Sequence, residues 1–397
     1  MNKLRITLIL IFIFNSLGLW SQNKENYNDV ISQIDLDNKE SLDFLHNQLG
    51  DKRIVFLGEV NHITTEFNKI KGAIIKHLIE KENFDVVLFE SPFYTLYVAN
   101  KNKEFITADS IMKSSIFRVW HTQENLELIE YIKNNKKVDL MGIDMHGRSK
   151  IFTNYLYDLL LKNKIDIADQ FKVNDSLLTY YEYKYASANG LHRIKEIYKT
   201  KEKYTQFYQT LINNLNKLSS IDSLEKVILK RCIQNRISLV DMLCYSGVTS
   251  NKTQQIRESF MADNLVFLTD TLFKNRKIIV WAHNEHIQKG NRQKYKNCSS
   301  MGNRFNKNHD SISYYIGLFA PLNKKNTKGE LYYNFNNCKY PMFYLPLTDK
   351  VCDKYPLLKN KGSLEKYLGG LIKNKRNLSE EYNAIIFSKT RTNNFHN

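Results

Sequence analysis

Histidine and carboxylate side chains recur at the ends of apolar segments in this 397-residue chain. Glu59 and His62 follow the segment RIVFLG, and Glu90 closes the segment DVVLFE. A neutral histidine beside a carboxylate suits proton removal from water, because the carboxylate keeps one ring nitrogen protonated and the other can accept a proton. The same side chains are also the usual ligands of a catalytic zinc ion.

Two further apolar segments end in the same kinds of residue. One ends in Asp144, with His146 two residues beyond it, and KIIVWAH ends in His283, with His286 three residues beyond it. Ligands of open α/β sheets bind beyond the carboxyl ends of the strands. We therefore expect these side chains to converge on one polar site.

Seven short apolar segments are predicted as strands, and several alternate with helices. The predicted strands are residues 53–58, 85–90, 138–144, 277–283, 311–319, 340–346 and 383–389. Apolar residues spaced three or four apart predict helices over 64–82, 123–134, 201–218, 223–245 and 251–274. This pattern indicates an α/β fold with a mainly parallel central sheet flanked by helices. The strand signal fades at approximately 150–275, where we expect a largely helical insertion.

The sequence lacks the motifs of several common enzyme classes. It has no GxSxG nucleophile elbow, no GxxxxGK[ST] or GxGxxG phosphate loop and no HExxH helix. The expected site therefore works without the usual serine nucleophile and without a nucleotide cofactor.

The first residues are typical of a secretory signal. Lys3 and Arg5 precede a mostly apolar run at 6–20, which is shorter than the ~20 residues of a membrane-spanning helix. We predict a signal peptide at 1–21, a single catalytic domain at 22–397, and an exported protein, periplasmic or secreted. An uncleaved anchor is the alternative, and no stable membrane insertion is expected after cleavage.

Charge and cysteine content exclude some partners. The formal net charge is +17, but the lysines are spread along the chain and no nucleic-acid-binding motif appears, so we expect no nucleic-acid partner. Five cysteines without a CxxC pair do not form a disulfide scaffold. An oxidising compartment would permit one bridge, for example Cys338 with Cys352.

Four sequence blocks, in order, resemble the erythromycin esterase-like family. They are LGEVNH with its following helix, GIDMHG, IRESFMADN and IIVWAHNEH. The resemblance implies a serine-independent hydrolase, needing no cofactor, that opens the lactone ring of macrolide antibiotics and so confers resistance. Its partner would be a small-molecule macrolide or a related lactone.

The resemblance also implies roles for individual residues. His62 corresponds to the general base and Glu59 to its carboxylate partner, while Glu90, His283 and His286 complete the catalytic centre. We further predict substrate-binding roles for Lys71, Glu66, Asp144, His146 and Arg257. Lys71 stands where family members often carry Arg, so the positive charge is kept and the planar guanidinium is lost.

Two other functions remain open. One is a metal-dependent hydrolase of another ester or of a peptide, with His62, Glu90, His283 and His286 as candidate ligands. The other is a binding protein without enzymatic activity, whose site has decayed.

Overall fold

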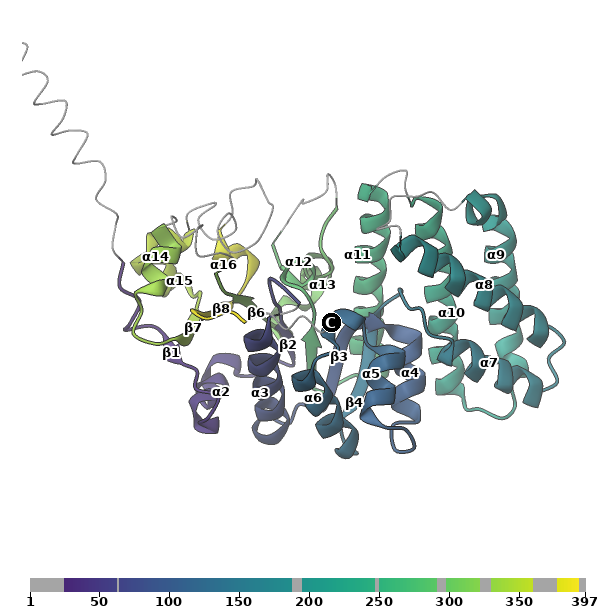
Figure 1. Cartoon of the computed structure of the whole chain (residues 1–397), viewed down its shortest axis with the longest axis horizontal. Helices are drawn as coiled ribbons and strands as arrows, with labels where there is room; N and C mark the ends of the chain where they lie inside the picture. The colour runs from purple at the N-terminus through teal and green to yellow at the C-terminus, as the bar shows by residue number, and fades with distance from the viewer. Residues whose placement is uncertain are drawn as a thin grey trace, which may run out of the picture.

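A single eight-stranded sheet forms the centre of the computed structural model, which describes residues 25–62, 64–187, 195–246, 250–290, 298–321, 330–359 and 377–392 (Figure 1). The predicted signal peptide lies outside the described residues. The strand order is β1-β7-β8-β6-β2-β5-β3-β4. The strands are β1 (Ser32–Gln33), β2 (Ile54–Leu57), β3 (Val86–Pro92), β4 (Asp139–Asp144), β5 (Ile278–Trp281), β6 (Ser313–Phe319), β7 (Met342–Pro346) and β8 (Ala384–Ser388).

The sheet is parallel from β8 through β4 and antiparallel only where β7 pairs with β8 and β1. Its strands are apolar on both sides: in β2, Ile54 and Phe56 pack into one hydrophobic layer, and Val55 and Leu57 into the other. Continuous apolar strands are what a parallel sheet covered on both faces requires. The predicted α/β fold with a mainly parallel sheet is confirmed.

Helices cover both faces of the sheet. One face packs against α2 (Phe44–Leu49), α3 (Thr65–Lys81), α5 (Ala108–Ser115) and α6 (Gln123–Asn134), and the other against α4 (Phe93–Lys101), α11 (Ser250–Phe267) and α13 (Met301–His309). Local capping fixes helix starts. The Thr122 side chain accepts a hydrogen bond from the Asn125 N–H at the start of α6.

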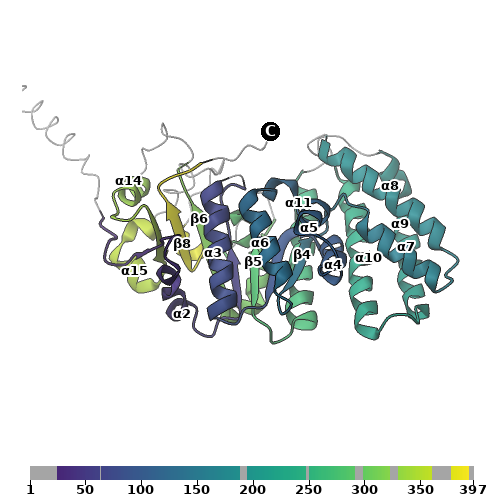
Figure 2. The same ribbon diagram turned by 60° about the horizontal axis from the view of Figure 1, so that its bottom comes forward.

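The helical insertion lies beyond the β4 end of the sheet (Figures 1 and 2). It comprises α7 (Ile151–Lys162), α8 (Ala168–Ser187), α9 (Lys195–Asn214) and α10 (Ser223–Cys244), and α11 returns the chain to the sheet. The opposite end carries α14 (Glu330–Asn336) and α15 (Asp349–Lys354) (Figure 1). The remaining short elements are η1 (Lys39–Leu42), η2 (Arg118–Trp120), η3 (Leu215–Lys217), the π-helical turn η4 (Leu268–Leu272), α12 (Asn284–Ile287), η5 (Asp310–Ile312), η6 (Pro356–Lys359) and α16 (Leu378–Glu381).

All seven predicted strands are present, within a few residues at their ends, and the insertion is helical as expected. The two-residue strand β1 was not predicted, because it is too short to give a pattern. All five cysteines are buried, and within the described residues none forms a disulfide, so the possible Cys338–Cys352 bridge is not present. No helix within the described ranges is long and apolar enough to cross a membrane.

Candidate active site

The carboxyl ends of three adjacent strands bring the predicted catalytic residues together. Glu59 follows β2, Glu90 lies near the end of β3, and His283 and His286 follow β5. The strand β5 pairs in parallel with both β2 and β3, so these three ends meet at one edge of the sheet. The groups expected at these three strand ends therefore lie together, whereas Asp144 and His146, at the end of β4, do not line the pocket.

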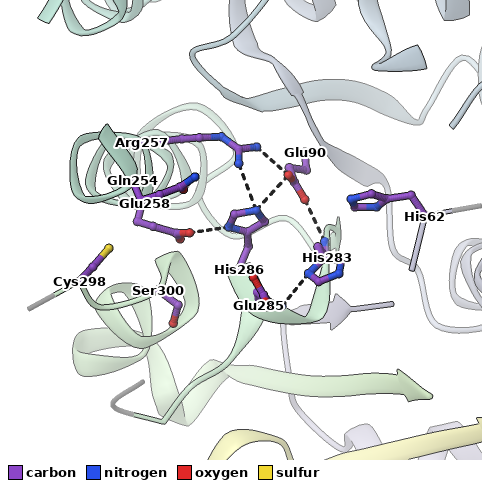
Figure 3. Close-up of a pocket in the computed structure, with 10 residues that line it drawn as sticks. All are labelled: His62, Glu90, Gln254, Arg257, Glu258, His283, Glu285, His286, Cys298 and Ser300. Atoms are coloured by element: carbon purple, nitrogen blue, oxygen red, sulfur yellow. Dashed lines mark hydrogen bonds and ion pairs between the residues drawn. The ribbon is translucent and has the colours of Figure 1, made fainter. Parts of the chain in front are cut away.

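A pocket of about 220 Å³ opens at this edge (Figure 3). Its lining residues are polar or carry sulfur: His62, Glu90, Gln254, Arg257, Glu258, His283, Glu285, His286, Cys298 and Ser300. Three of them come from α11, so the helix that returns the chain from the insertion to the sheet forms one wall.

His62 and Glu59 form a hydrogen-bonded pair beside the pocket. Glu59 is buried, and its Oε1 lies 2.9 Å from His62 Nδ1. With Nδ1–H donating to the carboxylate, the free Nε2 can accept a proton. The His62 side chain is 30% exposed, and its ring faces Glu90 and His283 (Figure 3). Burial lowers the pKa of His62, Glu90 opposes this effect, and the cations His286 and Arg257 reinforce it.

Two buried side chains hold the Glu59 carboxylate from behind. Lys71 Nζ donates to Oε2, and Trp120 Nε1 donates to Oε1 at 3.2 Å. Lys71 is fully buried in α3, with Nζ 3.9 Å from the centre of the Trp281 ring, and does not line the pocket. These contacts place it as a support for Glu59.

Glu90 accepts hydrogen bonds from three directions. Arg257 Nη2 lies 2.7 Å and His286 Nε2 3.1 Å from Oε1, and the His283 backbone N–H donates to Oε2 at 2.9 Å (Figure 3). Burial alone would raise the pKa of Glu90, but the positive charges of His286 and Arg257 hold it well below its usual range. Glu90 is therefore ionised and fixed in place.

His286 is held as an imidazolium by two carboxylates. Its Nδ1 lies 2.6 Å from Glu258 Oε1, while Nε2 meets Glu90. Burial acts to lower the pKa of His286, but Glu258 and Glu90 raise it to about 10. Glu258 also accepts the Met301 backbone N–H at 2.7 Å, which connects α11 to α13.

His283 is held in one neutral tautomer. Its Nε2 lies 3.1 Å from the Val60 carbonyl oxygen, and its Nδ1 accepts the Glu285 N–H at 3.1 Å. Burial first, and then the neighbouring His62, lower the pKa of His283 to about 3. Both ring nitrogens are therefore used in connecting the loop after β2 to the start of α12.

The predicted substrate-binding residues are dispersed. Arg257 lines the pocket and binds Asp144 Oδ2 through Nε at 2.9 Å, so Asp144 lies behind it, fully buried. His146 contacts Glu182 of α8, with 3.2 Å between Nδ1 and Oε1. Neither Asp144 nor His146 lines the pocket.

Glu66 is the fifth residue of that predicted set. Its carboxylate accepts hydrogen bonds from Thr392, near the end of the described chain, rather than facing the pocket. In space, Glu66 therefore binds the segment that follows β8.

Sequence reasoning missed several residues of the site. Glu258 directly follows Arg257 in the RES motif and was not singled out, although an adjacent carboxylate and guanidinium were a usable signal. Gln254 lies one helical turn before Glu258 on the same wall. Trp120 gave no signal, because its approach to Glu59 depends on how η2 packs.

The described residues include no group of three or more His, Cys, Asp or Glu side chains arranged to hold a metal ion. The site as described consists of hydrogen-bonded acid–base groups around a polar pocket.

Comparison with known proteins agrees with this fold. Residues 79–321 match the erythromycin esterase family. YbfO of Bacillus subtilis (strain 168), which is named only provisionally as a hydrolase, is 28% identical over 329 residues, covering 76% of this chain and 72% of YbfO. Erythromycin esterase type II of Escherichia coli is 23% identical over 380 residues, covering 84% and 82%.

Among solved structures, a mutant of the erythromycin esterase EreC in its open conformation superposes with a TM-score of 0.62 at 15% identity, covering 90% of this chain and 96% of that one. This likeness shows a shared fold. These matches place the chain among hydrolases built on a helix-flanked α/β sheet. Within them, the chain belongs to the erythromycin esterase family, as its sequence blocks predicted. Glu59, His62 and Lys71 lie before the span matched to the family.

Proposed function

We propose that the protein is a serine-independent carboxylic ester hydrolase that opens macrolide lactones or related lactones with water activated by His62. The observation that carries the proposal is the Glu59–His62 pair at the edge of the pocket. Glu59 keeps Nδ1 protonated, so Nε2 is the proton acceptor, and the lowered pKa keeps the ring neutral near pH 7. A base placed in this way contributes typically ~10²–10⁴-fold to a rate.

The opposite wall supplies positive charge for the tetrahedral intermediate. Arg257 Nη1 lies 3.3 Å from His286 Nε2, which is itself a donor to Glu90 and so cannot accept from Nη1. The N–H groups of Nη1 are therefore available to an oxyanion in the pocket. A well-placed donor of this kind is worth ~3–4 kcal/mol in the transition state.

The reaction needs no covalent enzyme intermediate. The water oxygen attacks the carbonyl carbon while its proton moves to His62 Nε2, and Arg257 Nη1 stabilises the oxyanion. The carbon–oxygen bond of the ester then breaks, and His62 returns the proton to the leaving alkoxide. The product is one hydroxy acid, formed from one lactone and one water.

A metal-dependent reaction on the same residues is the alternative. It would need nitrogens of His283 and His286 as ligands, but all four nitrogens of these two rings contact protein partners. This arrangement favours the metal-free reaction, and the effect of a chelator on turnover distinguishes the two.

Turnover of macrolides by the purified protein tests the proposal. We expect mass spectrometry to show the gain of one water by at least one macrolide in a panel of different ring sizes, with no effect of chelator and no gain in His62→Ala. The matched control is His46→Ala, because His46 also pairs with a glutamate, Glu82, at 3.1 Å, but its side chain is 74% exposed and does not line the pocket. Trapping of an acyl-enzyme would contradict the mechanism.

We also propose that the protein is exported and meets its substrate outside the cytosol. The support is the basic start and apolar run of residues 1–21. Cell fractionation with N-terminal sequencing tests this, and an uncleaved chain in the cytoplasm would contradict it.

A further inference from the structure

The loop that carries His62 is held firmly on its first side. Val60 donates its N–H to the Leu318 carbonyl oxygen at 3.2 Å and receives the His283 ring N–H on its own carbonyl. The Glu59 carbonyl oxygen accepts the Asn284 N–H at 2.8 Å. The backbone is therefore fixed two residues before His62.

On its second side, the loop enters α3 without a cap of its own. Thr64 occupies the N-cap position but makes no side-chain capping bond. The first N–H groups of a helix lack partners within the helix. Here the Thr65 N–H instead donates to the carbonyl oxygen of Thr392, at 3.0 Å.

Glu66 completes this contact. Its Oε2 accepts the Thr392 N–H at 2.8 Å, and its Oε1 accepts the Thr392 hydroxyl at 2.8 Å. We call the contact of Thr65 and Glu66 with Thr392 the tail clasp. A carboxylate in the first turn of a helix also interacts favourably with the helix dipole. Glu66 therefore stabilises the start of α3 in this second way, independently of Thr392.

The tail clasp connects distant parts of the sheet. Thr392 follows β8, which pairs with β6, and β6 separates β8 from β2. The segment after β8 therefore passes the end of β6 to reach the start of α3. Thr65 lies three positions after His62, a reach of at most ~10 Å. Val60 and Thr65, on either side of His62, thus both have backbone partners in the described chain.

We propose that the tail clasp is a positioning element for the proposed base: by fixing the start of α3, it holds His62 against Glu59 at the pocket. This inference rests on the proposed function, in which His62 activates water. Glu66 and Thr392 do not line the pocket, so the tail clasp acts through His62 and not on the substrate. Its loss should lower kcat and leave KM nearly unchanged.

The test uses p-nitrophenyl acetate as the ester probe, with the rate of His62→Ala subtracted. We expect Glu66→Ala to lower kcat ~10–100-fold, because a displacement of about 1 Å at a catalytic group can cost ~10²-fold. Glu66→Gln should recover most of the rate, since its amide oxygen still accepts the Thr392 N–H. The matched control is Glu80→Ala, at the other end of α3, where Glu80 accepts the Tyr131 hydroxyl at 3.1 Å.

A second variant tests the contact from the other partner. Thr392→Pro has no N–H to donate. It should reproduce the effect of Glu66→Ala, and the double variant should be little worse than either one, because both remove the same interaction. Additive losses would contradict the tail clasp, as would an unchanged kcat in Glu66→Ala or a fall in kcat/KM that lies entirely in KM.

Hydrogen exchange gives a readout that needs no substrate. We expect the peptide containing residues 59–66 to exchange faster in Glu66→Ala and Thr392→Pro than in the parent or in Glu80→Ala. Equal exchange in all four proteins would overturn the tail clasp. Turnover that persists in His62→Ala would instead overturn the proposed base, and the exchange result would then still report whether Thr392 holds the loop.

Discussion

Two arginines of the helical region each face two carboxylates, yet their surroundings differ. Arg236 of α10 is 1% exposed, and its donors are satisfied by fixed partners. Its Nε lies 2.8 Å from Asp175 Oδ1, its Nη1 donates to the Tyr94 hydroxyl at 2.8 Å, and its Nη2 donates to Thr179 Oγ1 at 2.9 Å. Glu182 lies 3.9 Å from Nη1. We call this the closed cluster.

Arg257 of α11 faces Asp144 and Glu90, but it is 16% exposed and lines the pocket. Its Nη1 points at another cation, His286. Opposing carboxylates raise the pKa of both arginines, which burial alone would lower. The comparison teaches that buried charge by itself does not identify a site. The distinguishing features are an open pocket and a donor, Arg257 Nη1, whose one partner among the described residues is the His286 ring.

The largest expected effect separates the two arginines by stability. Arg236→Ala leaves Asp175 buried without its charge partner, and breaking such a pair costs ~3–5 kcal/mol. Denaturant titration should show this loss. Arg276→Ala is the control, because Arg276 also binds two carboxylates, Asp85 and Asp139, but is 30% exposed, and exposed pairs contribute ~0–1 kcal/mol. Equal losses in the two variants would remove the contrast between closed and exposed clusters.

Substitution by lysine should lower kcat strongly at Arg257 and not at Arg236, the reverse of the order expected for stability. Arg257→Lys keeps the charge but loses the guanidinium geometry, so we expect kcat to fall ~10²–10³-fold, as for the loss of one oxyanion donor. Arg236→Lys should lower stability and leave the kcat of the folded enzyme unchanged. Steady-state kinetics on the substrate found by the macrolide panel measures both. An unchanged kcat in Arg257→Lys would show that a group other than the Arg257 guanidinium stabilises the oxyanion.

Stability should depend on pH through His286. Its pKa in the folded protein, about 10, lies above its ordinary value of 6.5, so its contribution is complete below pH 6.5 and is lost as the pH rises through 10. The free energy of unfolding should fall across this range by at most ~1.4 kcal/mol per pH unit from this group. His286→Gln should flatten the decline, and an equal slope in both proteins would contradict the imidazolium assignment.

The smallest expected effect is a shift of the pH–rate profile. Because the pKa of His62 is lowered, the acid limb of kcat/KM should lie below pH 6.5. Arg257 is one of the charges that lower it, so Arg257→Leu should move the limb upward, whereas Arg236→Lys should leave it in place. Profiles that coincide in all three proteins would show that the limb belongs to another group.

The sequence predicted those site residues that directly follow an apolar strand segment. Glu59, Glu90 and His283 end apolar segments, and parallel pairing brings strand ends together, so their grouping at one edge was predictable. Lys71 was less predictable. It lies on the apolar stripe of α3 with Phe67 and Ile74, which indicates burial, but the resemblance alone suggested a substrate contact.

Contacts between distant segments were not predictable from local patterns. Glu66 meets Thr392 across 326 positions, and His146 meets Glu182 of the insertion across 36. Nothing near either residue in the sequence shows its partner. The closed cluster was not predicted for the same reason, because Arg236 and Asp175 lie on different helices.

The place of β5 between β2 and β3 has a consequence for synthesis of the chain. Leu57 of β2 pairs with Trp281 of β5, more than 200 residues later. At a translation rate of ~5–20 residues per second, roughly 10–45 s pass between synthesis of β2 and synthesis of β5. During that time the edges of β2 and β3 that face β5 lack their native partner and can pair wrongly. The middle of this sheet can therefore close only after β5 has been synthesised, late in translation of the chain.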